Sequence, residues 1–208
     1  MSDAPRNFGP ETQGAIYLRG MSGALPDIPT SFTGLEAAAQ RKMSREAWAY
    51  TAGGAGLETA MDANRAAFAW FPIAPRMLGG AGVRDLRCEM FGAKAAAPTF
   101  SSPVGVLEMM HPDADLAVAR AMSRLKLPMI ISSQASYPME EIAAANGDGP
   151  RFYQLYWGKQ DGVAESFVKR AEACGCRAIF ITLDTTILGW RPRDLDLGFS
   201  PFLRSQGI

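Results

Sequence analysis

The sequence is poor in the residues that most often carry metal or covalent chemistry. Its 208 residues include one histidine and three cysteines, which offers few ligands for a zinc site and no even set for a disulfide framework. Lys and Arg total 21, as do Asp and Glu, and a zero net charge gives no general attraction for nucleic acid or anionic lipid. No apolar run approaches the roughly 20 residues of a membrane helix. The polar N-terminus does not resemble a signal peptide, so we expect a cytoplasmic protein with reduced thiols.

The pattern changes twice along the chain. Glycine and proline recur through residues 1–32, which predicts an irregular N-terminal arm. Residues 33–96 predict helices followed by a hairpin or plug over 81–94. Thr33 and Glu36 have the spacing of a capping box at the first helix, Gly53 ends the second, and the third runs over about 57–71.

From residue 97 to 208 the pattern alternates between strand, polar end and helix. Strands are expected over 98–105, 128–133, 151–157 and 178–184, and helices over 112–126, 138–146 and 162–175. Successive βαβ units build either a doubly wound sheet or a (βα)8 barrel. The missing Gly-x-Gly-x-x-Gly after the first strand weakens the first alternative. Both folds gather function at the C-terminal strand ends, which here carry Ser102, Ser132, Gln154 and Thr182.

Several strings in this order resemble one family. They are AWAYTAGGAG, SPVGVLEMMHPDAD, IISSQAS, RFYQLYW, ITLDTTILGWRPRDLD and PFLRSQGI. Together they resemble FMN-dependent 2-hydroxy-acid oxidoreductases, nearest the lactate monooxygenase and lactate oxidase branch. The resemblance implies the first four βα units of a (βα)8 barrel behind an N-terminal helical region. It also implies oxidation of a small L-2-hydroxy acid such as lactate, with FMN as cofactor, dioxygen as acceptor and a homo-oligomer for the full-length protein.

The resemblance assigns roles to residues at the strand ends. The flavin would be contacted by six of them: Pro103, Val104, Gly105, Ser132, Gln154 and Thr182. Gln and Thr suit this role because they donate and accept hydrogen bonds without adding charge. Gly105 stands where related oxidases tend to carry alanine. The extra room is expected to hold keto acid and peroxide together, which favours oxidative decarboxylation.

A second set of residues is implied for the substrate. Tyr50 and Arg191 would bind its carboxylate, because an arginine fork matches that group. Tyr156 would hydrogen-bond the hydroxyl, and Asp184 would support a histidine base that this chain does not carry. His111 is expected to be structural or capping instead.

Other interpretations remain open for these residues. Tyr50 could be a core aromatic, Arg191 a solvated charge, and Ser132 and Thr182 plain strand ends. Cys174 and Cys176 could suggest metal or redox chemistry, but no other cysteine or histidine lies near them in the sequence. Two alternatives remain for the whole chain. It could be a non-catalytic half barrel, or a decayed relative, that acts by association with another chain. It could also be a different (βα)8 enzyme with a phosphate-bearing substrate. The chain alone is expected to be inactive.

Overall fold

The computed structural model describes residues 8–79 and 85–204. Residues 1–44 and 45–208 form two compact units, and each is described here by itself. The first unit contains α1 (Phe8–Gly20) and α2 (Phe32–Gln40). Within the described ranges, no helix combines the length and the apolarity that crossing a bilayer would require.

The expectation of an irregular arm before residue 33 is wrong for α1. Pro10 lies in the first turn of this helix, where backbone N–H groups have no partner inside the helix, so its missing donor costs nothing. The predicted capping box at Thr33 is also wrong. Ser31 caps α2 in an extended conformation, and its side chain accepts a hydrogen bond from the Gly34 amide at 3.1 Å.

The second unit begins with two helices and a hairpin, all of which the sequence predicted. They are α3 (Arg45–Ala52), α4 (Thr59–Trp70), and the antiparallel pair β1 (Cys88–Met90) and β2 (Ala93–Ala95). Phe91 and Gly92 form the turn with φ of 50° and 73°, the positive values that a tight two-residue hairpin needs. Positions 81–84 of the predicted hairpin lie outside the described residues.

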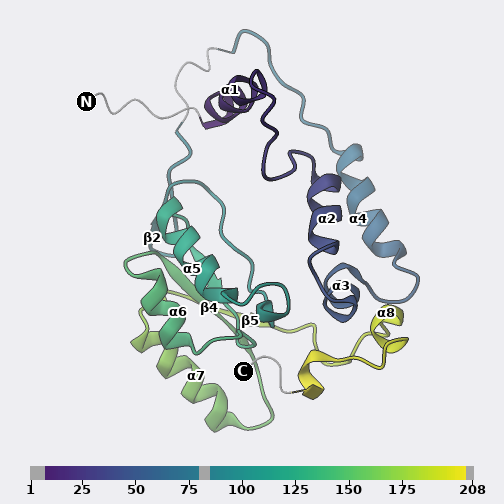
Figure 1. Ribbon diagram of the computed structural model, residues 1–208. Helices are drawn as coiled ribbons and strands as arrows, with labels where there is room; N and C mark the ends of the chain where they lie inside the picture. The colour runs from purple at the N-terminus through teal and green to yellow at the C-terminus, as the bar shows by residue number, and fades with distance from the viewer. Residues whose placement is uncertain (1–7, 80–84, 205–208) are drawn as a thin grey trace. The chain divides into compact units, whose positions relative to one another are not determined.

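The remaining elements alternate between strands and helices (Figure 1). In order they are η1 (Leu107–Met109), α5 (Ala114–Leu125), β3 (Met129–Ile131), α6 (Met139–Asn146), β4 (Arg151–Tyr156), α7 (Asp161–Ala173), β5 (Ile179–Thr182), α8 (Pro192–Leu195) and η2 (Pro201–Arg204). The strands β3, β4 and β5 form a parallel sheet in that order. The first predicted strand, over 98–105, is reduced to a bridge between Ser101 and Met129. Pro98 and Pro103 flank that bridge and have no N–H to extend it.

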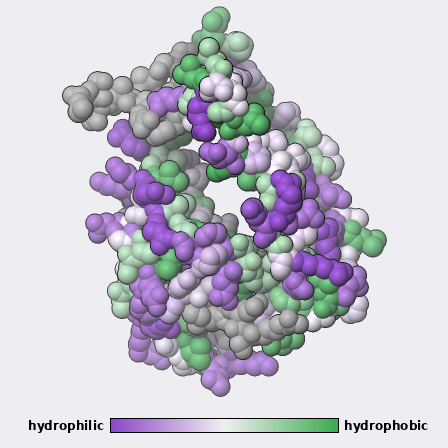
Figure 2. All heavy atoms as spheres, viewed as in Figure 1, coloured by the Kyte–Doolittle hydropathy of each residue, from purple (hydrophilic) through white to green (hydrophobic). Residues whose placement is uncertain are grey.

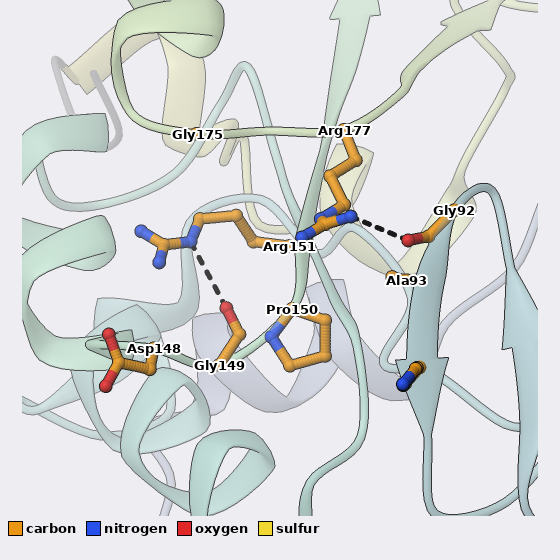
Figure 3. Close-up of a pocket in the computed structure, with 9 residues that line it drawn as sticks. Gly92, Ala93, Asp148, Gly149, Pro150, Arg151, Gly175 and Arg177 are labelled. Carbon is orange, nitrogen blue, oxygen red and sulfur yellow. Dashed lines mark hydrogen bonds between the residues drawn. The ribbon is translucent and has the colours of Figure 1, made fainter.

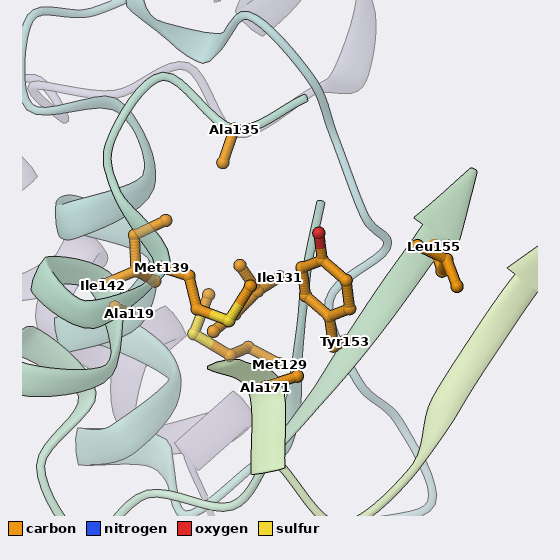
Figure 4. Packing of buried hydrophobic residues seen from close by; sticks show 9 residues of the cluster. All are labelled: Ala119, Met129, Ile131, Ala135, Met139, Ile142, Tyr153, Leu155 and Ala171. Atoms are coloured by element: carbon orange, nitrogen blue, oxygen red, sulfur yellow. The ribbon is translucent and has the colours of Figure 1, made fainter. Parts of the chain in front are cut away.

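The face of the sheet that α5, α6 and α7 cover holds the larger core. Met139 and Ile142 of α6 point toward Met129 and Ile131 of β3 (Figure 4), and all four are at most 5% exposed. On α7, Ala164 and Ala171 are buried and Phe167 packs against this core, whereas Val163 is 45% exposed.

The opposite face of the sheet is lined in two zones. Near the start of the strands, Phe152 and Phe180 pack with Ile130 and with Ala93 of the hairpin. Toward their C-terminal ends, the same alternation of side chains brings polar residues onto this face. Apolar side chains also remain at the surface, among them Phe100 at 40% and Ile181 at 51% exposed. Figure 2 shows hydrophobic groups interspersed with hydrophilic ones on the face in view.

Candidate active site

Three side chains form a continuous row across the C-terminal ends of the parallel strands. Gln154 lies on β4 and is 2% exposed. Its Nε2 donates to Thr182 Oγ1 on β5 at 2.9 Å, and its Oε1 accepts from Ser132 Oγ, after β3, at 3.4 Å. The Ser133 amide donates to the same Oε1 at 3.1 Å. The structure therefore brings together three of the six residues predicted to contact the flavin.

This row suits the polar edge of a planar ring. Gln154 keeps a second Nε2 proton, and Thr182, which is half-buried, can donate from its hydroxyl. No member of the row is charged, and burial without charge avoids a large desolvation cost. The described residues thus fit the hydrogen-bonding edge of an isoalloxazine, although Ser102, the fourth predicted strand end, is exposed.

The loop expected to face the flavin lies against the loop that follows β3. The Val106 amide donates to the Gln134 carbonyl at 3.0 Å. A Cβ added at Gly105 would lie 3.0 Å from Gln134 Cβ and 3.2 Å from its carbonyl oxygen. The room at Gly105 is therefore bounded by Gln134, a neighbour that sequence reasoning did not identify. Pro103 is half-buried and Val104 is 42% exposed.

Tyr50 and Arg191 come together although 141 positions separate them. The guanidinium carbon of Arg191 lies 5.0 Å from the centre of the Tyr50 ring, and Arg191 Nη2 donates to the Tyr50 carbonyl. Arg191 Nε also donates to Asp194 Oδ2 at 2.6 Å. Asp194 is a partner that the sequence analysis missed, although the i,i+3 spacing of a helical ion pair was present.

Tyr156 connects the polar row with this pair. It lies two residues beyond Gln154 on β4, on the same face and therefore about 6.6 Å along the strand, and it pairs in register with Thr182. Burial raises the pKa of Tyr50, while Arg191 lowers it and Asp194 and Tyr156 raise it. The Tyr50 phenol is thus kept protonated and able to donate.

The other predicted residues have simpler surroundings. Asp184 is exposed, two residues past the end of β5. His111 accepts a hydrogen bond from the Asp113 amide at its Nδ1, 3.1 Å away, which is the local capping role expected for it. Cys174 and Cys176 pack against the larger core, and burial raises the pKa of Cys176 to about 12.

A separate cavity lies at the other end of the sheet. It has a volume of about 480 Å³ and is lined by Lys94, Asp148, Arg151 and Arg177, among others (Figure 3). Arg151 donates to the Ala143 and Cys174 carbonyls at the C-terminal ends of α6 and α7. Arg177 donates to the Gly92 carbonyl at 2.6 Å. Both arginines therefore tie structural elements together, far along the strands from the polar row.

Comparisons with known proteins identify the family. A family model described as FMN-dependent dehydrogenase matches residues 39–206. The FMN-dependent alpha-hydroxy acid dehydrogenase qulF of Penicillium citrinum is 39% identical over 98% of this chain and 50% of its own length. L-lactate oxidase of Lysinibacillus sphaericus (strain C3-41) is 35% identical over 91% of this chain and 49% of its own length.

Solved structures agree with the sequence matches. A mandelate oxidase structure has a TM-score of 0.78 and 37% identity, over 83% of this chain and 50% of that one. A lactate oxidase of Pediococcus acidilactici has a TM-score of 0.80 and 30% identity, over 84% and 49%. This chain belongs to the FMN-dependent dehydrogenase family, and it spans about half the length of the relatives it matches. Its alternating strands and helices are part of a (βα)8 barrel.

Proposed function

We propose that this chain contributes to an FMN-dependent enzyme that oxidises a small L-2-hydroxy acid, with lactate as the substrate and dioxygen as the acceptor. The observation that carries this proposal is the uncharged row of Ser132, Gln154 and Thr182 beside Tyr156, Tyr50 and Arg191. Such an enzyme needs residues that hydrogen-bond the polar edge of the flavin next to residues that bind the substrate carboxylate.

In this proposal the chain's own residues bind and orient. Tyr50 and Arg191 hold the substrate carboxylate, and the cation stacked on the ring presents its remaining donors in a fixed plane. Tyr156 hydrogen-bonds the substrate hydroxyl. Ser132, Gln154 and Thr182 hold the polar edge of FMN, which supplies the two-electron chemistry when bound.

The base that takes the hydroxyl proton comes from outside this sequence. The single histidine, His111, is held in the turn before α5 by the Asp113 amide. In this proposal Asp184 orients and electrostatically supports a histidine from the rest of the barrel. The chain on its own is then inactive, and the exposed apolar groups Phe100 and Ile181 are covered by the completing strands.

The substrate is tested by steady-state oxygen consumption with the complete FMN-loaded protein. We expect kcat/KM for L-lactate to exceed the values for glycolate and L-mandelate by at least about tenfold, a difference of about 1.4 kcal/mol in transition-state binding. A preference for mandelate would reject lactate while leaving the 2-hydroxy-acid class intact. Absence of oxygen uptake with every 2-hydroxy acid would reject the class.

Gly105 supports the finer proposal of oxidative decarboxylation. In that outcome lactate and dioxygen give acetate, carbon dioxide and water, whereas simple oxidation releases pyruvate and hydrogen peroxide. Gly105→Ala fills the space next to Gln134 and is expected to raise free pyruvate and peroxide. If the products of the wild type already are pyruvate and peroxide, or if Gly105→Ala leaves the product ratio unchanged, this finer proposal is wrong.

A further inference from the structure

Asp115 is a buried carboxylate at the start of α5 for which the flavin and substrate sites described above have no use. Asp115 lies in the first turn of α5, where a negative charge is favourable even at the surface. The structure instead leaves Asp115 only 4% exposed, and its Oδ2 accepts a hydrogen bond from the Ser136 amide at 2.8 Å. The Tyr137 amide also interacts with this carboxylate. Asp115 therefore contacts a different segment of the chain, beyond β3.

Two loops meet at this point. The Gly105 loop comprises residues 103–113, and the Ser132 loop comprises residues 132–137. The Val106 amide donates to the Gln134 carbonyl at 3.0 Å, the Glu108 amide to Ser136 Oγ at 3.0 Å, and Tyr137 Oη to the Pro112 carbonyl at 2.9 Å. With the contact of Asp115, these hydrogen bonds join the loops at both ends.

The Gly105 loop needs such support because its backbone is strained. Val106 is fully buried with φ of 50°, and Ala114, beside Asp115, has φ of 36°. A β-branched residue is rare in this region of backbone space. Strained backbone persists only where the surroundings fix it, and it gathers at functional sites.

A purely local role for Asp115 does not account for its contacts. Its neighbour Asp113 is exposed and pairs with Arg120 on the same helix at 2.8 Å, as a surface charge near a helix start does. Asp115 is buried, and burial raises the pKa of its carboxyl against the opposing effect of the Ser136 amide. Burying a carboxylate is costly unless hydrogen bonds compensate it, and the bond from the Ser136 amide ties Asp115 to a different segment of the chain.

We propose that Asp115 is a positioning residue that fixes the Gly105 loop against the flavin through Ser136 and the Ser132 loop. The inference rests on the proposed FMN site. It adds that the position of the Gly105 loop beside the flavin depends on a carboxylate that does not itself contact flavin or substrate. Because Ser132 begins one loop and Gly105 lies in the other, a shift between the two loops changes the polar row and the flavin face together.

The test compares Asp115→Asn with the matched surface variant Asp113→Asn in the complete FMN-loaded protein. The amide keeps the shape but can accept at only one of its two ends. We expect Asp115→Asn to weaken FMN binding about tenfold, to shift the visible absorption of the bound flavin, and to lower kcat more than it changes KM. Asp113→Asn should remain within about twofold of the wild type in each quantity.

A merely structural role would give another result. If Asp115→Asn lowers Tm but leaves FMN affinity per folded molecule, flavin absorption and kcat as in Asp113→Asn, the proposal is overturned. If Asp115→Asn does not fold, Asp115→Glu decides by the same criteria, because it keeps the carboxylate but displaces its oxygens from the Ser136 amide. Wild type that fails to bind FMN would reject the proposed function instead, so the two failures are distinguishable.

Discussion

Gln154 Nε2 donates a hydrogen bond to Thr182 Oγ1 across 2.9 Å, and this contact joins β4 to β5 through their side chains. The other end of the Gln154 amide accepts from the Ser133 amide and from Ser132. One buried side chain thus fixes the spacing of three strand ends. In the proposed function these ends carry the polar contacts of the flavin, so the amide of Gln154 sets the geometry of that edge.

Gln154→Leu should weaken FMN binding without preventing folding. The substitution keeps the volume but removes the Nε2 donor proposed to contact the flavin, and the loss of one such hydrogen bond costs about 0.5–1.5 kcal/mol, or roughly 2- to 12-fold in affinity. Titration of the apoprotein with FMN, followed by quenching of flavin fluorescence, measures the change. Thr182→Ser is the control, because it keeps the hydroxyl and should bind FMN within about threefold of the wild type. Equal affinity in wild type and Gln154→Leu would show that this row does not hold the flavin.

Arg191→Lys should raise KM for a 2-hydroxy acid by about tenfold or more. Lysine cannot reproduce the planar fork that stacks on Tyr50 and donates to both Asp194 and the Tyr50 carbonyl. The loss of one charged hydrogen bond is worth about 1.5–3 kcal/mol. Steady-state kinetics measure the effect.

Arg193→Lys is the matched control for that variant. Arg193 is two residues away and pairs with Glu58 at the surface, so its replacement by lysine should leave KM unchanged within about twofold. Equal effects of the two substitutions would mean that Arg191 has no special part in substrate binding.

The ion pair between Glu140 of α6 and Arg170 of α7 should stabilise the fold only above acidic pH. Arg170 donates twice to this carboxylate and lowers its pKa from 4.5 to about 2. Because the folded-state pKa is depressed, the stabilisation is fully present above about pH 4.5 and is lost as pH falls toward 2. Both side chains are more than 40% exposed, so solvent screening limits the contribution to about 0.5–1 kcal/mol.

Urea unfolding of the wild type and Glu140→Gln checks this dependence. The variant should be less stable at pH 7, and the difference should shrink as pH approaches 2. Glu141→Gln, at the exposed neighbouring position, should show little change at either pH. A difference that stays constant from pH 7 to pH 2 would contradict an origin in this carboxylate.

Local pattern was enough to predict the three strands of the parallel sheet and the polar residues near their ends. Ser132 follows an apolar run, Thr182 ends one and Gln154 lies within one, and parallel strands bring their C-terminal ends to one edge. The hairpin could be expected for the same reason, since Gly92 supplies a positive φ between two short strands.

Contacts between distant segments could not be predicted in this way. Nothing in the order of residues says that Asp115 reaches the Ser136 amide or that Gln134 lies against Gly105, because both depend on how two loops meet. The burial of single positions on α7 depends on such contacts as well, since Ala164 and Ala171 are buried while Val163 on the same helix is 45% exposed.

The account is tested most directly by anaerobic mixing of the complete FMN-loaded protein with L-lactate in a stopped-flow spectrometer. We predict rapid loss of the visible absorption of oxidised flavin with L-lactate, no such loss with D-lactate, and a markedly slower reaction in Arg191→Lys at the same substrate concentration. Flavin that stays oxidised in the presence of L-lactate and of every other L-2-hydroxy acid would contradict the account.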